Sequence, residues 1–247
     1  MSASAMLKSA ATCACFLAAL IGLFGCTSPQ RAPVDAALFA KLETLPADGV
    51  VAADDLYPDQ TQARTYLVVA GEQVGENVQR TLQATEEHQA AWASHEGEAR
   101  TEYWSVDDDG AVHLHAVYEA GDAAVTHFDP PLSWPAALPP GEAHREESAM
   151  RVVDAADPTV QKASGKATRT LEYLDNQQIR TPRGTMIAQR VSVHFTAELG
   201  VATAETTSMY YVVPGVGVVA EESSERVRIL GMFDRESDRT VVLVDSE

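Results

Sequence analysis

The chain has few basic residues, few aromatic residues and almost no cysteine. It carries 18 lysines and arginines against 36 aspartates and glutamates, which gives a formal net charge of −18. Such an acidic chain repels phosphate backbones and anionic lipid, so we expect no nucleic-acid partner and no electrostatic docking on membranes. All three cysteines lie at Cys13, Cys15 and Cys26, so residues 27–247 hold no thiol for a disulfide and must be stabilised by a core.

Residues 1–26 have the layout of a bacterial lipoprotein signal peptide. One cation, Lys8, precedes an apolar run from Ala10 to Phe24, and Gly25 then precedes Cys26. The run is too short to span a bilayer comfortably, and the small residue before cysteine suits cleavage. We therefore expect removal of residues 1–25 and acylation of Cys26, with palmitate among the acyl chains, so that the anchor holds the protein on a membrane.

The residues around Cys26 also predict the net charge, the tether and the location of the mature protein. Residues 1–25 contain Lys8 and no acid, so their removal takes the net charge from −18 to −19. Residues 26–36 contain Pro29 and Pro33 and are expected to form a tether between the lipid and the folded body. Thr27 is not aspartate, which predicts an outer-membrane protein that faces the periplasm.

The remaining residues alternate between polar and apolar positions and predict a mainly-β protein. A β-hairpin is expected over 101–118, because Asp109-Gly110 is a favoured turn pair between two alternating runs. A short helix is expected over 35–45, where three leucines share one helical face, and 77–84 is assigned to strand with 85–94 left open between helix and strand. Further strands are expected over 65–70, 166–174, 186–197, 204–213, 217–227 and 240–244.

Residues 37–247 are expected to form one β-rich domain in two halves. The segment 129–141 contains five prolines and is interpreted as an irregular connector between those halves. Two similarities hint at an internal duplication: 80–83 resembles 169–172, and 103–112 resembles 210–219. The two offsets differ, so chance similarity between two meandering sheets is an equal alternative.

The second half resembles a group of uncharacterised bacterial envelope lipoproteins. The resemblance rests on Thr181-Pro-Arg-Gly-Thr-Met-Ile-Ala-Gln-Arg-Val191, on Ser208-Met-Tyr-Tyr-Val-Val-Pro-Gly-Val-Gly-Val-Val219, and on Pro140-Gly141-Glu142 at the end of the proline-rich segment. It implies a curved antiparallel sheet, a half-barrel similar to the carriers LolA and LolB, with one or two short helices. It carries over no catalytic residue. The turn at 214–217 is expected to bend one strand and re-aim it.

Two functions follow from these residues. The first is a non-catalytic, lipid-anchored envelope protein without a cofactor, which binds an apolar ligand or a protein partner in a groove lined by Trp104 and Tyr211. The alternative is an envelope hydrolase or metal-dependent enzyme. It would use His113, His115 and Glu119, which strict alternation places on one face of a strand.

Overall fold

Strands and three short 3₁₀ segments account for most of residues 37–56, 63–229 and 233–246, which are the residues described by the computed structural model. No helix among these residues is long and apolar enough to cross a membrane. The 3₁₀ segments are η1 (Ala53–Asp55), η2 (Glu87–Gln89) and η3 (Ala120–Asp122). The strands are β1 (Ala40–Leu45), β2 (Val51–Ala52), β3 (Arg64–Gly71), β4 (Asn77–Ala84), β5 (Trp92–Glu96), β6 (Arg100–Val106), β7 (Val112–Glu119), β8 (Ala124–Trp134), β9 (Ala137–Leu138), β10 (Ala143–Asp154), β11 (Gln161–Thr181), β12 (Gly184–Leu199), β13 (Ala202–Val213), β14 (Gly217–Ile229) and β15 (Phe233–Ser246).

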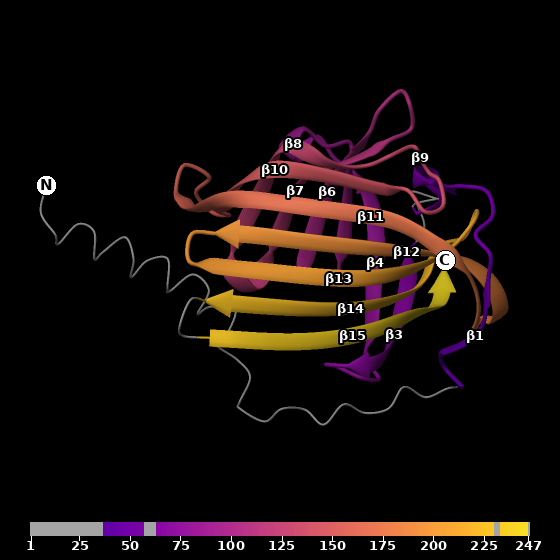
Figure 1. Ribbon diagram of the computed structural model, residues 1–247. Helices are drawn as coiled ribbons and strands as arrows, with labels where there is room; N and C mark the ends of the chain where they lie inside the picture. The colour runs from indigo at the N-terminus through magenta and orange to yellow at the C-terminus, as the bar shows by residue number, and fades with distance from the viewer. Residues whose placement is uncertain (1–36, 57–62, 230–232, 247) are drawn as a thin grey trace, which may run out of the picture.

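One antiparallel sheet closes on itself to form a barrel (Figure 1). The order round the ring is β11-β10-β8-β7-β6-β5-β4-β3-β15-β14-β13-β12, and β12 pairs back with β11 along most of its length. The expectation of a mainly-β, curved antiparallel sheet with few helices is confirmed. The sheet curls further than a half-barrel, because the long β11–β12 hairpin joins its two edges.

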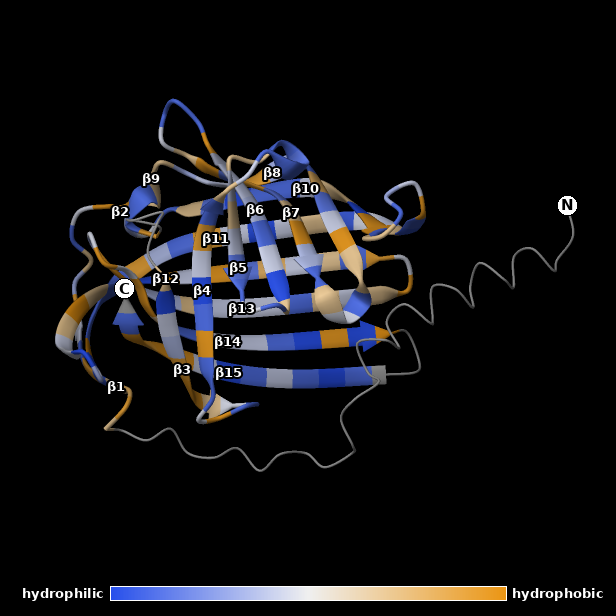
Figure 2. Cartoon of the chain, turned by 180° about the vertical axis from the view of Figure 1, so that it is seen from behind, coloured by the Kyte–Doolittle hydropathy of each residue, from blue (hydrophilic) through white to orange (hydrophobic). Residues whose placement is uncertain are grey.

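Alternation along each strand sorts side chains between the inside and the outside of the barrel. On β12, Val193 and Phe195 face the interior, whereas His194 and Thr196 face outward, where the hydroxyl of Thr196 contacts the ring of His194. Figure 2 shows the same change of hydropathy from residue to residue along the neighbouring strands. The inward-facing side chains therefore line the interior of the barrel.

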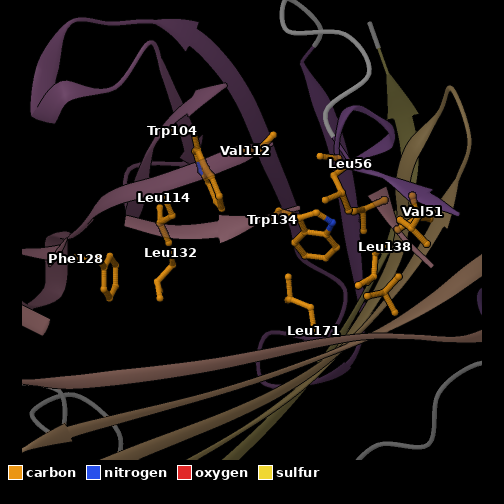
Figure 3. Close-up of a cluster of buried hydrophobic side chains, with 14 of the residues drawn as sticks. Val51, Leu56, Trp104, Val112, Leu114, Phe128, Leu132, Trp134, Leu138 and Leu171 are labelled. Atoms are coloured by element: carbon orange, nitrogen blue, oxygen red, sulfur yellow. The ribbon is translucent and has the colours of Figure 1, made fainter. Parts of the chain in front are cut away.

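The segment before β3 closes one end of the barrel. β2 pairs with the short strand β9, which places Val51 opposite Leu138, and η1 follows directly. Val51, Leu138 and Leu56 are buried against Trp134 in the largest apolar cluster (Figure 3). Burial of each of these side chains contributes about 1.5–3 kcal/mol. It fixes residues 51–56, which we call the plug, across the end of the barrel.

The short helix expected over 35–45 is wrong for the residues that are described. Ala40–Leu45 forms β1, which pairs with residues 176–180 of β11 beyond the point where β10 ends. That stretch of β11 would otherwise leave backbone N–H and C=O groups unpaired, and β1 satisfies them. Leu42 is 42% exposed, so the leucine spacing does not mark a buried face.

The proline-rich segment is not an irregular connector. Residues 129–134 continue β8, and 137–138 form β9. The pairing of β8 with β7 jumps from His127 to Leu132, so Pro130 and Pro131 lie in a bulge where the ladder needs no N–H from them. The two expected halves consequently lie in one continuous sheet.

The remaining local expectations have mixed outcomes. The hairpin over 101–118 is confirmed as β6 and β7, and 77–84 is confirmed as β4. Residues 85–94 contain both η2 and the start of β5. The segment 214–217 does not re-aim a strand: it is the hairpin turn between β13 and β14, where Gly215 has a φ of 72° and Gly217 a φ of 98°.

Candidate ligand cavity

The barrel encloses a cavity of about 590 Å³. Leu56 of the plug lies at one end, and the cavity extends to Glu72, which follows β3, and to Asp238 in the middle of β15. The volume falls within the range of about 300–1,000 Å³ that is typical of small-molecule sites. The cavity is therefore large enough for a small organic ligand, and its lining decides which kind.

Six neighbouring strands of the ring, β7, β8 and β10–β13, form an apolar wall, and all of them except β10 contribute residues that line the cavity. Arg169 is the one charged member of this wall among the described lining residues, and it donates two hydrogen bonds to Glu146 Oε1 at 2.7 and 2.9 Å. Trp134 stacks on Tyr210 across the wall with ring centroids 6.2 Å apart. The apolar members are Leu114, Val117, Phe128, Leu132, Trp134, Val193, Phe195, Ala204 and Tyr210.

The other six strands, β14, β15 and β3–β6, form a charged wall. Arg80 Nη2 lies 2.9 Å from Glu221 Oε2, and its Nε lies 3.0 Å from Glu96 Oε2. Arg239 Nη1 donates to the other oxygen of Glu96 at 2.8 Å. Arg80 also lies over the ring of Tyr66, 4.7 Å from its centroid. Side chains from β3, β4, β5, β14 and β15 are thereby tied into one network.

Electrostatics within this network keep its members ionised. Burial would raise the pKa of Glu96, but the guanidinium groups of Arg80 and Arg239 outweigh that effect and lower the pKa to about 2. Burial would likewise lower the pKa of Arg80, but Glu221 and Glu96 outweigh it and hold the pKa above its ordinary value. The charged wall is therefore a set of fixed charges at neutral pH.

A second ionic cluster lies nearer the start of β6. Arg100 donates through Nε and Nη2 to Glu102 Oε1, at 3.1 and 2.9 Å, and through Nη1 to Glu119 Oε1 at 2.6 Å. Burial raises the pKa of Glu119 despite the nearby Arg100. Trp104 Nε1 donates to Glu102 Oε2 at 3.2 Å, so this aromatic ring is held at the boundary between the charged and apolar walls.

Two side chains that line the cavity carry buried donors without an acceptor among the described residues. Trp134 is 4% exposed, and its Nε1 has no hydrogen-bond partner among the described residues. Nε and Nη2 of Arg239 are also buried and without an acceptor there. A buried donor that lacks an acceptor costs about 1–3 kcal/mol. A ligand that supplies oxygen atoms would recover this free energy.

The structure separates the two aromatic residues expected to line a groove. Trp104 lines the cavity. Tyr211 does not: it is fully buried on the outer side of β13, where it packs edge-on against Phe39 at 5.4 Å and donates to Glu222 at 2.7 Å. Its neighbour Tyr210 faces the cavity instead, because adjacent residues of a strand point to opposite sides. Burial, with Glu221 and Glu102 nearby, raises the pKa of Tyr210, so its hydroxyl stays protonated.

His113, His115 and Glu119 do not form the expected cluster. A bulge in the pairing of β6 with β7 leaves His115 without a partner in the ladder, so alternation is interrupted and Glu119 faces the interior. His113 Nε2 lies 3.0 Å from Asp107 Oδ2, and His115 Nε2 lies 2.7 Å from Ser105 Oγ. No group of three or more metal-ligating side chains occurs in residues 37–56, 63–229 and 233–246.

Sequence reasoning missed the charged residues inside the barrel. Arg100, Glu102 and Trp104 recur at every second position of β6, which places all three on the inner face. The i, i+2 spacing of opposite charges beside an aromatic residue was the available signal. It is normally interpreted as the solvent-facing side of a sheet, and only closure of the barrel turns that side inward. Cys26, the expected lipidation site, lies outside the described residues.

Comparison with known proteins identifies no family for this chain. No family model matches the chain, and no curated protein matches it. Among solved structures, a protein of Parabacteroides distasonis that is provisionally described as a lipoprotein aligns over 76% of this chain and 96% of its own, with 10% identity and a TM-score of 0.38. A similarity of this size carries no argument about the function of the present chain.

Proposed function

We propose that this protein is a lipid-anchored protein of the cell envelope that binds an amphiphilic small molecule inside its barrel, without catalysis. The observation that supports it is the division of the 590 Å³ cavity into an apolar wall and a charged wall. An entirely apolar ligand would make no hydrogen bonds with the charged wall. A small polar ligand would leave Val193, Phe195 and Tyr210, which line the cavity and are only half-buried, in contact with water.

The binding free energy would come mainly from the apolar wall. Burial of apolar surface contributes roughly 25 cal/mol per Å², and the aromatic side chains supply the largest areas. The ion pairs of the charged wall already satisfy most of their own hydrogen bonds, so they contribute less to the affinity than the apolar wall and chiefly orient the ligand. Binding should consequently depend little on salt, because the contacts are enclosed and screening acts chiefly on exposed charges.

The anchor and the location belong to this proposal. Acylation at Cys26 would hold the barrel at a membrane, and Thr27 favours the outer membrane with the barrel in the periplasm. A protein partner that receives or delivers the ligand is compatible with this placement. The alternative of a metal-dependent enzyme built on His113, His115 and Glu119 finds no support in the geometry, because each side chain has a separate polar partner.

The test is a binding titration with a fluorescent acyl-chain probe, dansyl-undecanoic acid. The full-length chain is placed in lipid nanodiscs, and the signal of empty nanodiscs is subtracted. Ala204→Phe fills part of the cavity, and Ala149→Phe places the same ring on an exposed position of β10 as the matched control. We expect saturable binding that Ala204→Phe weakens at least tenfold and Ala149→Phe leaves unchanged. No saturable binding, or equal binding by both variants, would refute the proposal.

A further inference from the structure

One edge of the Arg239 guanidinium has no hydrogen-bond partner among the described residues. Nη1 bonds Glu96, whereas Nε and Nη2, which together form one edge of the planar group, are buried and lack an acceptor among the described residues. Arg239 lines the cavity from β15, and its side chain is 29% exposed. The two unpaired N–H groups are therefore buried, in a side chain that lines the cavity.

Other arginines of this chain show what that edge binds. Arg226 donates through Nε and Nη2 to the two oxygens of Asp234, at 3.0 and 2.9 Å. Arg190 uses the same two nitrogens on the two oxygens of Asp175. A two-pronged contact of this kind matches a planar carboxylate in spacing and direction. In Arg239 the same edge is free, so the group that completes it must come from outside the described chain.

The position of Arg239 relative to the apolar wall sets the orientation of a ligand. β15 and β8 are separated by six steps in either direction round the ring of twelve strands, so they lie on opposite sides of the barrel. β8 contributes Phe128, Leu132 and Trp134 to the cavity. A ligand whose polar end lies at Arg239 would therefore extend its apolar part across the interior onto β8.

We propose that Arg239 binds the carboxylate of an acyl-chain ligand through Nε and Nη2, with the chain packed on Phe128, Leu132 and Trp134. This inference rests on the proposed function and specifies its ligand class. Arg80, Arg239, Glu96 and Glu221 sum to zero charge, so the carboxylate gains directed hydrogen bonds rather than a positive field. A carboxylate has two coplanar oxygens that match one guanidinium edge, whereas a doubly charged phosphate adds a second negative charge beside Glu96 and Glu221.

The experiment compares ligands that differ only at the head: dodecanoic acid, dodecanol, methyl dodecanoate and dodecyl phosphate. Each displaces dansyl-undecanoic acid from the full-length chain in nanodiscs at pH 7.5. The variants are Arg239→Gln, Arg239→Lys and, as a matched control on the outer face, Arg226→Gln. Hydrogen bonds to a charged group predict that the acid binds about tenfold to a hundredfold more tightly than the alcohol and the ester.

Arg239→Gln should abolish that preference, and Arg239→Lys should remove most of it, because lysine keeps the charge but not the two-pronged edge. Arg226→Gln should preserve it. Melting curves establish that each variant is folded. Equal binding of acid and alcohol, or an unchanged preference in Arg239→Gln, overturns the role of Arg239 while the proposed function stands. Tighter binding of the phosphate overturns the choice of carboxylate, and no displacement by any of the four overturns the proposed function itself.

Discussion

The two walls of the cavity are held together by different physical means. The apolar wall packs side chains such as Leu132, which is 1% exposed, and gains free energy in proportion to the area removed from water. The charged wall joins strands through Arg80, Glu96 and Glu221, whose attraction must first offset the cost of desolvating them. The apolar wall can adapt to a ligand of variable shape, whereas the charged wall fixes directions. An amphiphile needs both properties in one cavity.

The largest expected effect concerns the apolar wall. Leu132→Ala should lower the free energy of unfolding by about 3–4 kcal/mol, because the lost apolar contacts are joined by the cost of the space left behind. Chemical denaturation of both proteins measures the difference. Leu42→Ala is the matched control, since Leu42 is 42% exposed, and its cost should stay within about 0.5 kcal/mol. Equal costs for the two variants would mean that Leu132 is not enclosed.

The charged wall should respond somewhat less. Arg80→Met leaves Glu96 and Glu221 without their shared partner, and we expect a loss of about 2–3 kcal/mol. This is below the value for a fully buried pair, because the Arg80 side chain keeps 26% of its surface exposed. The double variant Arg80→Met/Glu221→Gln should recover part of the loss. If the double variant is less stable than the single one, repulsion between the two carboxylates is not the cause.

Acid should weaken the charged wall selectively. The pKa of Glu96 is about 2 in the folded chain against an ordinary value of 4.5, so its ionised form stabilises the fold above pH 4.5. That contribution, on the order of 2 kcal/mol, should disappear as the pH falls from 4.5 to 2. Glu96→Gln should therefore lose less stability than the parent over this interval. Parallel stability curves for the two proteins would contradict the ion pairs seen here.

The smallest expected effects separate the inner and outer faces of β13. Tyr211→Phe removes a hydrogen bond to Glu222 on the outer face and should cost about 1 kcal/mol of stability without changing ligand affinity. Tyr210→Phe removes a hydroxyl that faces the cavity, so it should change affinity and alter stability by less than about 0.5 kcal/mol. The reversed pattern in denaturation and probe titration would mean that the assignment of faces is wrong.

Local sequence signals predicted most of the strands but not the closure of the sheet. Alternation at 186–197 and 204–213 and the turn pair Asp109-Gly110 are properties of neighbouring residues, so they can be recognised without the fold. The irregular connector expected over 129–141 was wrong because a bulge tolerates Pro130 and Pro131 inside β8, and a bulge depends on the partner strand. The helix expected over 35–45 was wrong because residues 40–45 pair, as β1, with the part of β11 that lies beyond the end of β10.

The candidate site was predicted only in part, for the same reason. Trp104 faces the interior as the groove hypothesis required, but one residue of offset placed Tyr211 outside and Tyr210 inside. The bulge at His115 similarly separates Glu119 from the two histidines. Arg239 could not be recognised, because its role depends on which edge of its guanidinium remains unpaired after Glu96 binds the other side.

The central claim is that an acyl chain lies against the apolar wall, and quenching of Trp134 tests it most directly. The full-length chain contains three tryptophans, so Trp92→Phe/Trp104→Phe leaves Trp134 as the one emitter. Fatty acids brominated near the far end of the chain, or near the carboxylate, are titrated into this variant in nanodiscs. We predict strong, saturable quenching by the distal bromine and weaker quenching by the proximal one. Equal quenching by both, or none at saturation, would contradict an acyl chain that runs from Arg239 to β8.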